Sequence, residues 1–364
     1  MRKRSFLVLA GVTAVAVVAA VVLQPSGRVA AFKGSGKLVS PELPKAINNV
    51  HSITIARRAG TLTIIRAKDG WRLKERGGYP VKPESVKQIL VGLSGMKTLE
   101  PKTDRKDRYE RLQLREIAHK DSKSQLVTVT GPDNKTLAKL IIGKVSAGRF
   151  GPGQVYFRRP GQKRAWKAEG DLSIDNDATN WLVKPVMDIR KTRVRHFAVS
   201  RASGESVAAE RPKPGEALKL TTDPLPDGMV PKTDGTVGSL ANALDKLDLV
   251  DVREVSKIDW KTKTVATAEI RSYDGVVITA RVAQTGKNEF WVRFEASFDA
   301  DDTLAPKDAA LKKLEIKSAA EAKKEVAGLT AGLKGWAFKL SKRNLNLLKI
   351  ELKEVLEKKK KKSS

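Results

Sequence analysis

The sequence predicts an α+β protein, in which two pattern-related halves follow an N-terminal transmembrane helix. Three observations predict this fold class. Near the N-terminus, an uncharged run extends from Ser5 to Leu23. Beyond it, short segments of alternating apolar residues are separated by turns containing Gly or Pro, which is typical of antiparallel strands. One order of elements (a strand pair, a helix, a hairpin and a strand) then occurs twice along the chain. Each half is therefore expected to be an antiparallel β-sheet with one or two packed helices.

The composition indicates a globular protein with a basic surface. Of 364 residues, 40% are hydrophobic and 30% are charged, which suits a folded core of two domains. There are 70 Lys and Arg against 41 Asp and Glu, a formal net charge of +29. This charge attracts polyanions such as nucleic acid, anionic lipid or an acidic partner, and a solvated basic surface is the alternative. The absence of Cys excludes disulfides, Cys-ligated zinc, thiolate nucleophiles and iron–sulfur clusters.

Residues 1–23 are predicted to be a basic cap followed by the transmembrane helix. A 19-residue helix from 5 to 23 spans about 28 Å, close to the roughly 30 Å of a bilayer core. The basic residues before it place the N-terminus in the cytoplasm and the rest of the chain outside. A cleaved signal peptide is the alternative, because small residues occur at Ala19-Ala20, within this run, and at 29–31, after it.

Residues 24–45 are rich in Pro and Gly and are predicted to be a flexible tether. The "GSGK" at 34–37 resembles a phosphate-binding loop, but Ala31 stands where that motif needs Gly. Leu38 follows the Lys where the motif needs Ser or Thr. We therefore expect no nucleotide site here.

The first half is predicted to occupy residues 46–190. Alternating apolar residues at 51–55 and 62–64 predict a hairpin, and the Asp-Gly turn at 69–70 leads into a third strand. Pro83 suits the first turn of a helix. Trp71 and Tyr79 are expected to cover the sheet beside that helix, with a ligand-facing Trp71 as the alternative. The apolar face of the helix consists of Val86, Ile89, Leu90, Leu93 and Met96.

A polar segment from Lys97 to Lys123 separates this helix from a second hairpin. We expect it to be a solvated helix or loop, with a polyanion site as the alternative. The hairpin is predicted at 126–142 around the turn at 131–134, and further strands at 155–158 and 165–167.

The second half is predicted to occupy residues 191–342 and to repeat this order. A strand at 197–199 precedes a helix whose apolar positions repeat the earlier spacing. The turn Asp274-Gly275 is the strongest hairpin signal in the chain. Strands are predicted at 290–294 and 336–340. The apolar face of this helix consists of Val237, Leu240, Ala241, Leu244 and Leu247.

The end of the chain is predicted to contain two helices. Ser318 and Glu321 have the spacing of a capping box before one apolar face. Residues 343–364 are predicted to be a last helix, near 344–356, and a disordered Lys-rich tail at 358–362.

No reaction can be assigned from motifs. His51, His119 and His196 have no metal-ligand spacing. The acidic clusters at 175–177 and 299–302 are expected to be solvated loops, with Ca²⁺ as the alternative. A calcium loop starting at residue 175 would need Gly where Asn180 stands. We therefore predict no catalytic, cofactor-binding or metal-binding residue, and no enzyme.

The runs "SITIAR", "DGWRL", "KLIIGK", "VYFRR", "WKAEGDL" and "NDATNWLVKPVMDIRKTRV" resemble a bacterial family called domain of unknown function 4340. The resemblance extends over about residues 47–340. It implies a membrane-anchored protein, and some members are encoded beside ABC-type transporters of the gliding-motility kind. The family has no established catalytic residues. Here the high basic charge and the Lys-rich end depart from it.

We therefore expect an inner-membrane protein with a single span, a cytoplasmic N-terminus and a periplasmic body. Its expected role is accessory or scaffolding, in a membrane protein complex whose candidate members are transporter subunits. The alternative is an envelope protein that binds polyanions or anionic lipid, and an unrecognised hydrolase is less favoured. An exported body would be separated from nucleic acid, so nucleic acid is not an expected partner. The sequence does not determine the oligomeric state.

Overall fold

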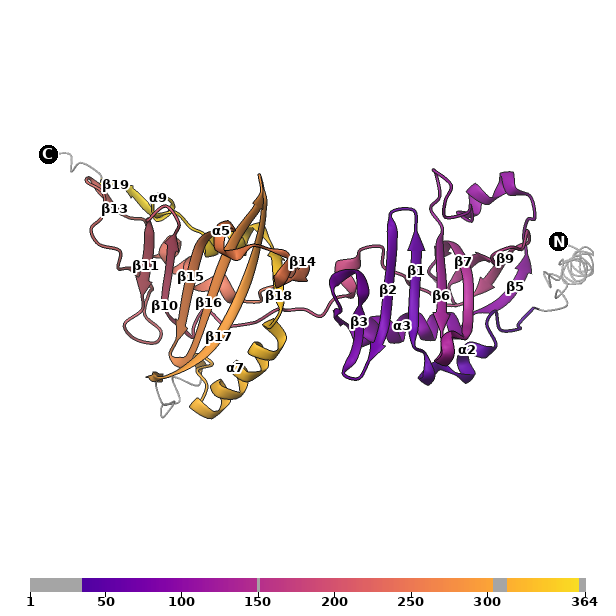
Figure 1. The fold of residues 1–364 in the computed structure, drawn as a ribbon, viewed down its shortest axis with the longest axis horizontal. Helices are drawn as coiled ribbons and strands as arrows, with labels where there is room; N and C mark the ends of the chain where they lie inside the picture. Colours follow the sequence, from indigo (N-terminus) through magenta and orange to yellow (C-terminus); the bar gives the residue numbers. More distant parts are fainter. Residues whose placement is uncertain (1–34, 149–150, 304–312, 360–364) are drawn as a thin grey trace, which may run out of the picture. The chain divides into compact units, whose positions relative to one another are not determined.

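A computed structural model describes residues 35–148, 151–303 and 313–359. The described residues have an α+β fold of mostly antiparallel sheets with few helices, as predicted (Figure 1). Their contacts divide them into two compact units. One contains the described residues up to 50, then 55–60 and 88–173. The other contains 51–54, 61–87 and the described residues from 174 onward.

The predicted basic cap and transmembrane helix lie outside the described residues. Within the described ranges, no helix combines the length and apolar character needed to cross a membrane.

The described part of the predicted tether is packed against the first unit. Gly36 N donates a hydrogen bond to Thr98 O at 2.8 Å, and Leu38 forms an isolated bridge with Lys97. Helix α2 (Glu42–Lys45) buries Leu43 completely, and Val39 is 2% exposed. The prediction of a flexible tether was wrong for the described residues 35–45, because apolar side chains near the prolines are buried in the core.

The first sheet has nine strands in the order β4-β3-β2-β1-β6-β7-β8-β9-β5. Strands β2, β3 and β4 pair antiparallel, as do β6, β7, β8, β9 and β5 in turn. Its strands are β1 (Ser52–Arg57), β2 (Gly60–Ala67), β3 (Gly70–Leu73), β4 (Tyr79–Val81), β5 (Lys97–Pro101), β6 (Gln125–Thr130), β7 (Thr136–Ser146), β8 (Gln154–Arg158) and β9 (Ala165–Glu169). Short 3-10 helices are η1 (Ile47–Asn49), η2 (Lys74–Arg76), η3 (Lys106–Leu112), η4 (Pro132–Asn134) and η5 (Ala178–Trp181).

Helix α3 (Pro83–Gly95) confirms the helix predicted from the apolar spacing. All five residues of the predicted face are buried, at 6% exposure or less. Gly92 allows a close approach, because a Cβ there would lie 2.6 Å from Asp171 O. Tyr79 is buried, whereas Trp71 is half-buried and lies under the Arg66 guanidinium, 5.4 Å from the ring centre.

The segment from 97 to 123 is not simply solvated. It begins with β5 at the edge of the sheet and continues through η3. Tyr109 is 4% exposed and Leu114 is fully buried, and both pack with Ile141 and Ala165. The prediction of a solvated segment was wrong because these two side chains enter the core from an otherwise charged run.

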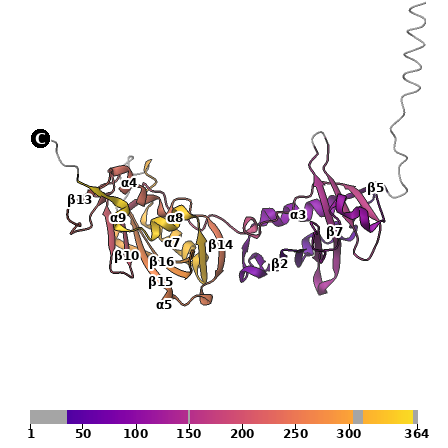
Figure 2. The same ribbon diagram turned by 90° about the horizontal axis from the view of Figure 1, so that it is seen from above.

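The second sheet has eight strands in the order β12-β11-β10-β15-β16-β17-β18-β14. Helix α7 packs on β16 and β17, and α8 packs on β15, as Figure 2 shows from above. Strands β13 and β19 form a separate antiparallel pair. The strands are β10 (Val194–Arg201), β11 (Ser206–Glu210), β12 (Lys219–Leu220), β13 (Met229–Pro231), β14 (Leu249–Glu254), β15 (Thr264–Ser272), β16 (Asp274–Gly286), β17 (Glu289–Thr303), β18 (Trp336–Leu340) and β19 (Leu356–Lys358). The helices are α4 (Asp234–Gly238), η6 (Ser239–Leu244), η7 (Val255–Lys257), α5 (Trp260–Lys263), α7 (Ala319–Leu333), α8 (Lys342–Leu348) and α9 (Leu352–Val355).

The predicted hairpin at Asp274-Gly275 and the predicted capping box at Ser318 are both confirmed. The helix predicted near 237–247 is split into α4 and η6, and all five of its apolar residues are buried. The prediction of one last helix at 344–356 was wrong. Residues 342–358 instead form α8, α9 and β19, because β19 pairs with β13 and takes Leu356 out of the helix. Lys359 N donates to Gly228 O at 2.9 Å, and the tail from residue 360 lies outside the described residues.

The two sheets share one strand order. From β3 onward, the first sheet has the order β3-β2-β1-β6-β7-β8-β9-β5. The first three strands therefore stand in reverse chain order, the next four stand in chain order, and β5 lies at the far edge. From β12 onward, the second sheet has the order β12-β11-β10-β15-β16-β17-β18-β14. This is the same arrangement, with β14 in the position of β5. Helix α3 precedes β5, and α4 with η6 precedes β14. The clearest addition to the second sheet is α7, between β17 and β18.

Candidate anion-binding pocket

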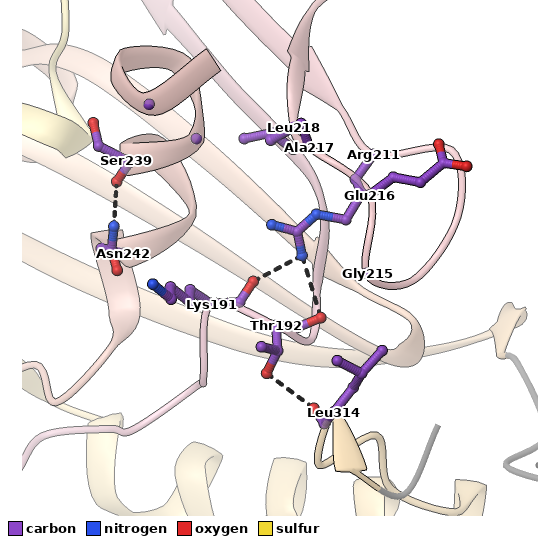
Figure 3. A pocket seen from close by; sticks show the side chains of 12 residues that line it. Lys191, Thr192, Arg211, Gly215, Glu216, Ala217, Leu218, Ser239, Asn242 and Leu314 are labelled. Atoms are coloured by element: carbon purple, nitrogen blue, oxygen red, sulfur yellow. Dashed lines mark hydrogen bonds between the residues drawn. The ribbon is translucent and has the colours of Figure 1, made fainter. Parts of the chain in front are cut away.

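A hollow of about 400 Å³ lies in the second unit, between β11, the segment before β10, and the α4–η6 turn. Figure 3 shows these elements around it. Arg211 follows the last residue of β11, and Lys191 and Thr192 precede β10. The volume falls within the range of small-molecule sites, about 300–1,000 Å³.

Among the described charged residues that line this hollow, Arg211 alone is buried, at 8% exposure. Its Nη1 donates to Lys191 O at 2.9 Å and to Thr192 O at 3.2 Å (Figure 3). Its Nε is buried without a hydrogen-bond partner. Within the described part of the chain, Nη2 has no hydrogen-bond partner and no carboxylate forms an ion pair with the guanidinium. Among the described residues, the hydrogen bonds to the guanidinium therefore come from two backbone carbonyls.

The backbone of Arg211 is held in place on both sides. Its N donates to Arg195 O at 2.8 Å, and its O accepts a hydrogen bond from the Tyr273 hydroxyl at 2.6 Å. Burial raises the pKa of Tyr273 to about 12, so this donor keeps its proton at neutral pH. Burial lowers the pKa of Arg211, which is the expected effect of removing a cation from water without an acid beside it.

The hydroxyl groups on the hollow are already used. Thr192 Oγ1 donates to Leu314 O at 2.9 Å, and Ser239 Oγ donates to Thr236 O at 2.6 Å. Asn242 Nδ2 donates to Ser239 O at 3.1 Å. Figure 3 shows the Glu216 carboxylate turned away from the guanidinium. A nucleophile needs a base within hydrogen-bond reach, and the hydroxyls that line this hollow have backbone carbonyls instead.

The remaining wall of the hollow is largely apolar. Leu218 is fully buried, and Ala217 and Leu314 also line the hollow. Gly235 and Gly238 of α4 also line the hollow, and a Cβ placed on either would have no neighbour within 4 Å. The arrangement is thus one cation at one wall with apolar space next to it, which suits binding of an anion.

A second hollow, of about 580 Å³, lies in the first unit beside Tyr109 and Arg158. Arg158 is 3% exposed and lies 4.8 Å from the centre of the Tyr109 ring. It pairs with Glu116 at 2.5 Å and donates to Gln162 O at 3.0 Å. Its charge is therefore matched by an acid, unlike that of Arg211.

The residues singled out by sequence motifs are not brought together into one site. His119 lines the second hollow, and its Nδ1 accepts a hydrogen bond from Asp121 N at 3.1 Å. His196 Nδ1 lies 3.7 Å from Glu210, and His51 is exposed before β1. Over the ranges that the structure describes, no three His, Asp or Glu side chains are grouped to hold a metal ion.

The carboxylates of the first acidic cluster bond within their own segment, and Asp299 of the second bonds to Arg271 of β15. Asp175 Oδ1 accepts from Asp177 N at 2.8 Å, and Asp177 Oδ1 accepts from Thr179 N at 2.8 Å, which caps η5. Asp299 Oδ2 accepts from Arg271 Nη1 at 3.1 Å. The first cluster therefore closes a turn, whereas the prediction of a loop at 299–302 was wrong, because β17 continues to Thr303.

Sequence reasoning missed Arg211. It stands in the Pro-rich loop that follows β11, and its neighbours in sequence do not distinguish it from other arginines. Only its burial, which depends on segments far apart in the chain, marks it.

The fold and this hollow define a class: an α+β protein of antiparallel sheets that carries a buried cation in a ligand-sized hollow. The chain belongs to the family described as domain of unknown function (DUF4340), whose model matches residues 71–332. The match runs from β3 to the end of α7 and confirms the resemblance seen in the sequence. The search of curated proteins found no match.

Proposed function

We propose that this protein is a membrane-anchored extracytoplasmic accessory or scaffold protein that binds a partner or ligand and catalyses no reaction. The observation that carries the proposal is the Arg211 hollow. It offers a buried cation that no acid of the described residues pairs with, while its hydroxyls donate to backbone carbonyls. This arrangement favours binding of an anion over bond making or breaking.

The proposed location is the bacterial inner membrane, with one span, a cytoplasmic N-terminus and a periplasmic body. Support comes from the sequence alone: an uncharged run at 5–23 follows three basic residues. The role does not require a particular oligomeric state.

The shared strand order supports a further part of the proposal, which is that residues 46–190 and 191–342 are two pattern-related halves with one common arrangement of strands. Eight strands follow one another in the same spatial order in both sheets. Two copies of a sheet module, each with its own edges, fit a scaffold that contacts more than one neighbour.

The proposed partner is a membrane protein complex, with ABC-type transporter subunits as the first candidates. The family resemblance implies this neighbourhood. A second candidate function is binding of an anionic lipid surface, favoured by the net charge of +29. Each Lys or Arg near such a surface contributes about 1 kcal/mol.

The test is co-purification of the tagged full chain from its native membranes in mild detergent, together with topology reporters fused after residue 45. We expect integral membrane proteins to co-purify and only an extracytoplasmic reporter to be active. Activity confined to a cytosolic reporter would reject the proposed location. Recovery without any protein partner, but salt-sensitive retention on anionic vesicles, would favour the lipid-binding function.

A further inference from the structure

We infer that the hollow beside Arg211 binds a carboxylate joined to an apolar body, as in a short amphiphilic acid or an apolar peptide C-terminus. This inference rests on the proposed binding function and adds the chemical class of the ligand. It is carried by three features of the hollow: its charge, its wall and its rigidity.

The charge of the hollow fits one negative charge. Arg211 is the one buried cation that lines it, and its Nη2 is unused by the described residues. Figure 3 shows the guanidinium directed between Leu218 and Lys191, with Nη1 tied to the two carbonyls. A carboxylate oxygen at Nη2 would form a charge-assisted hydrogen bond. A polyanion would leave further charge without a buried partner, which is unfavourable.

The wall of the hollow fits an apolar body. Leu218, Ala217 and Leu314 line it, and Gly235 and Gly238 add no side chains to fill it. The two glycines of the α4–η6 turn therefore leave space beside the Arg211 guanidinium, which larger side chains at these positions would fill. Each CH₂ group of a ligand that enters this space leaves water, which makes the free energy of binding more favourable.

The cation is held in position before any ligand arrives. Nη1 makes two hydrogen bonds to the carbonyls of Lys191 and Thr192, and Thr192 Oγ1 is tied to Leu314 O. The backbone of Arg211 is bonded to Arg195 and Tyr273. A preorganised donor loses little conformational entropy on binding.

The experiment uses the full chain in nanodiscs of phosphatidylcholine, with calorimetry and saturation-transfer NMR as readouts. The probes are acetate, hexanoate and 1-hexanol. We expect hexanoate to bind at least tenfold more tightly than acetate, because part of its chain is buried. We expect no saturable binding of 1-hexanol, which has the chain without the charge.

The first variant is Arg211→Met, which keeps the length of the side chain and removes its charge. We expect the affinity for hexanoate to fall at least tenfold. The matched control is Arg201→Met. Arg201 also donates to a backbone carbonyl, that of Lys349, but it pairs with Glu351 at 3.3 Å and does not line the hollow. This control should leave the affinity within twofold of the unmodified chain.

The second variant is Gly238→Leu, which keeps Arg211 and takes up apolar space. Gly238 has no positive φ and no neighbour within 4 Å of a Cβ, so the helix accepts a side chain there. We expect the preference for hexanoate over acetate to fall at least fivefold, while acetate binding is retained.

To separate the two sources of the carboxylate, hexanoate is compared with an apolar tripeptide as its free acid and as its C-terminal amide. Stronger binding of the free acid than of hexanoate assigns the site to a peptide C-terminus, and the reverse assigns it to a free amphiphilic acid. Either result supports the carboxylate.

Equal binding of hexanoate and 1-hexanol, or unchanged hexanoate affinity in folded Arg211→Met, overturns the inference. If Arg211→Met does not fold, the comparison of hexanoate with 1-hexanol and the Gly238→Leu variant still test the inference. Membrane partners that co-purify while hexanoate fails to bind would reject the ligand class alone. Hexanoate binding by a chain without membrane partners would reject the accessory role alone.

Discussion

Arg193 donates a hydrogen bond from Nε to the carboxylate of Asp274 at 2.8 Å, and both side chains are almost completely removed from solvent, at 2% and 0% exposure. Arg193 also donates from Nη1 and Nη2 to Glu325 of α7, at 3.1 and 2.5 Å. Asp274 accepts further bonds from Ser272 Oγ at 2.5 Å and from Lys317 N at 3.0 Å. One arginine before β10 thus joins the β15–β16 turn to α7.

Arg193 and Arg211 are contrasting cases of the same side chain. Both are buried, but Arg193 has two acids, and hydrogen bonds to Glu325 and Asp274 outweigh its desolvation and raise its pKa. For Arg211, desolvation dominates and the pKa is lowered. We therefore expect the first arginine to stabilise the fold, and we propose the second as the ligand contact.

Replacing Asp274 by Ala should lower the free energy of unfolding by about 3–5 kcal/mol, because it leaves a buried cation partly unpaired. Urea unfolding of the full chain, followed by Trp fluorescence, measures this loss. The control is Asp69→Ala, whose carboxylate is 69% exposed and pairs with Arg72. That pair should contribute no more than about 1 kcal/mol. Equal losses in the two variants would show that the Arg193 network does not stabilise the fold.

The contribution of Glu325 to stability should depend on pH. Burial alone would raise the pKa of Glu325, but hydrogen bonds from Arg193 and Lys317 outweigh it, and the pKa lies below its ordinary value. A carboxylate with a lowered folded-state pKa stabilises the protein above its unfolded pKa, and this stability is lost as pH falls through the folded pKa.

We therefore expect the stability difference between the unmodified chain and Glu325→Gln to stay constant from neutral pH down to about 5, and to shrink below about pH 4. Urea unfolding at a series of pH values measures it. Glu357→Gln, at an exposed position of β19, serves as the control and should show no comparable change. A Glu325→Gln difference that grows on acidification would contradict the assigned ion pair.

Gly275 should tolerate no side chain. Its φ is +81°, and a Cβ there would lie 2.4 Å from Asp299 O in the neighbouring strand. Gly161 has a similar φ of +79° but no neighbour within 4 Å. Ala at Gly161 should cost about 1–2 kcal/mol for the left-handed backbone. Ala at Gly275 should cost at least about 1 kcal/mol more, because β17 must shift. Thermal unfolding of both variants tests this difference, and equal costs would reject the steric explanation.

The capping box of α7 should contribute about 1 kcal/mol. Ser318 Oγ accepts from Glu321 N at 3.4 Å, and Glu321 Oε2 accepts from Ser318 N at 2.9 Å. Ser318→Ala is expected to speed amide hydrogen exchange in the first turn of α7. Ser94→Ala is the matched control, because Ser94 Oγ donates to Val91 O near the end of α3 and caps no N-terminus. Similar exchange in α7 of both variants would exclude the cap as a source of stability.

Much of the secondary structure could be predicted because it depends on local patterns. The apolar spacing from Val86 to Met96 requires a helix with one buried face, and the Asp274-Gly275 turn requires a residue that adopts positive φ. Predictions failed where a distant segment decided the outcome. Leu43 is buried within the expected tether, and Tyr109 is buried within a charged segment. Leu356 leaves its expected helix to pair with β13.

The class of fold, the positions of most strands and helices, and the family of the chain could all be predicted from the order of its residues. These follow from periodicity, turn residues and the runs of residues that resemble the family. That Arg211 differs from the other buried arginines of the described chain, Arg158 and Arg193, in having no ion-paired acid could be seen only in the folded protein. The burial of Arg211 depends on Lys191, Thr192, the α4–η6 turn and Leu314, which are far apart in sequence. Desolvation is a property of that assembly, and no local pattern of residues encodes it.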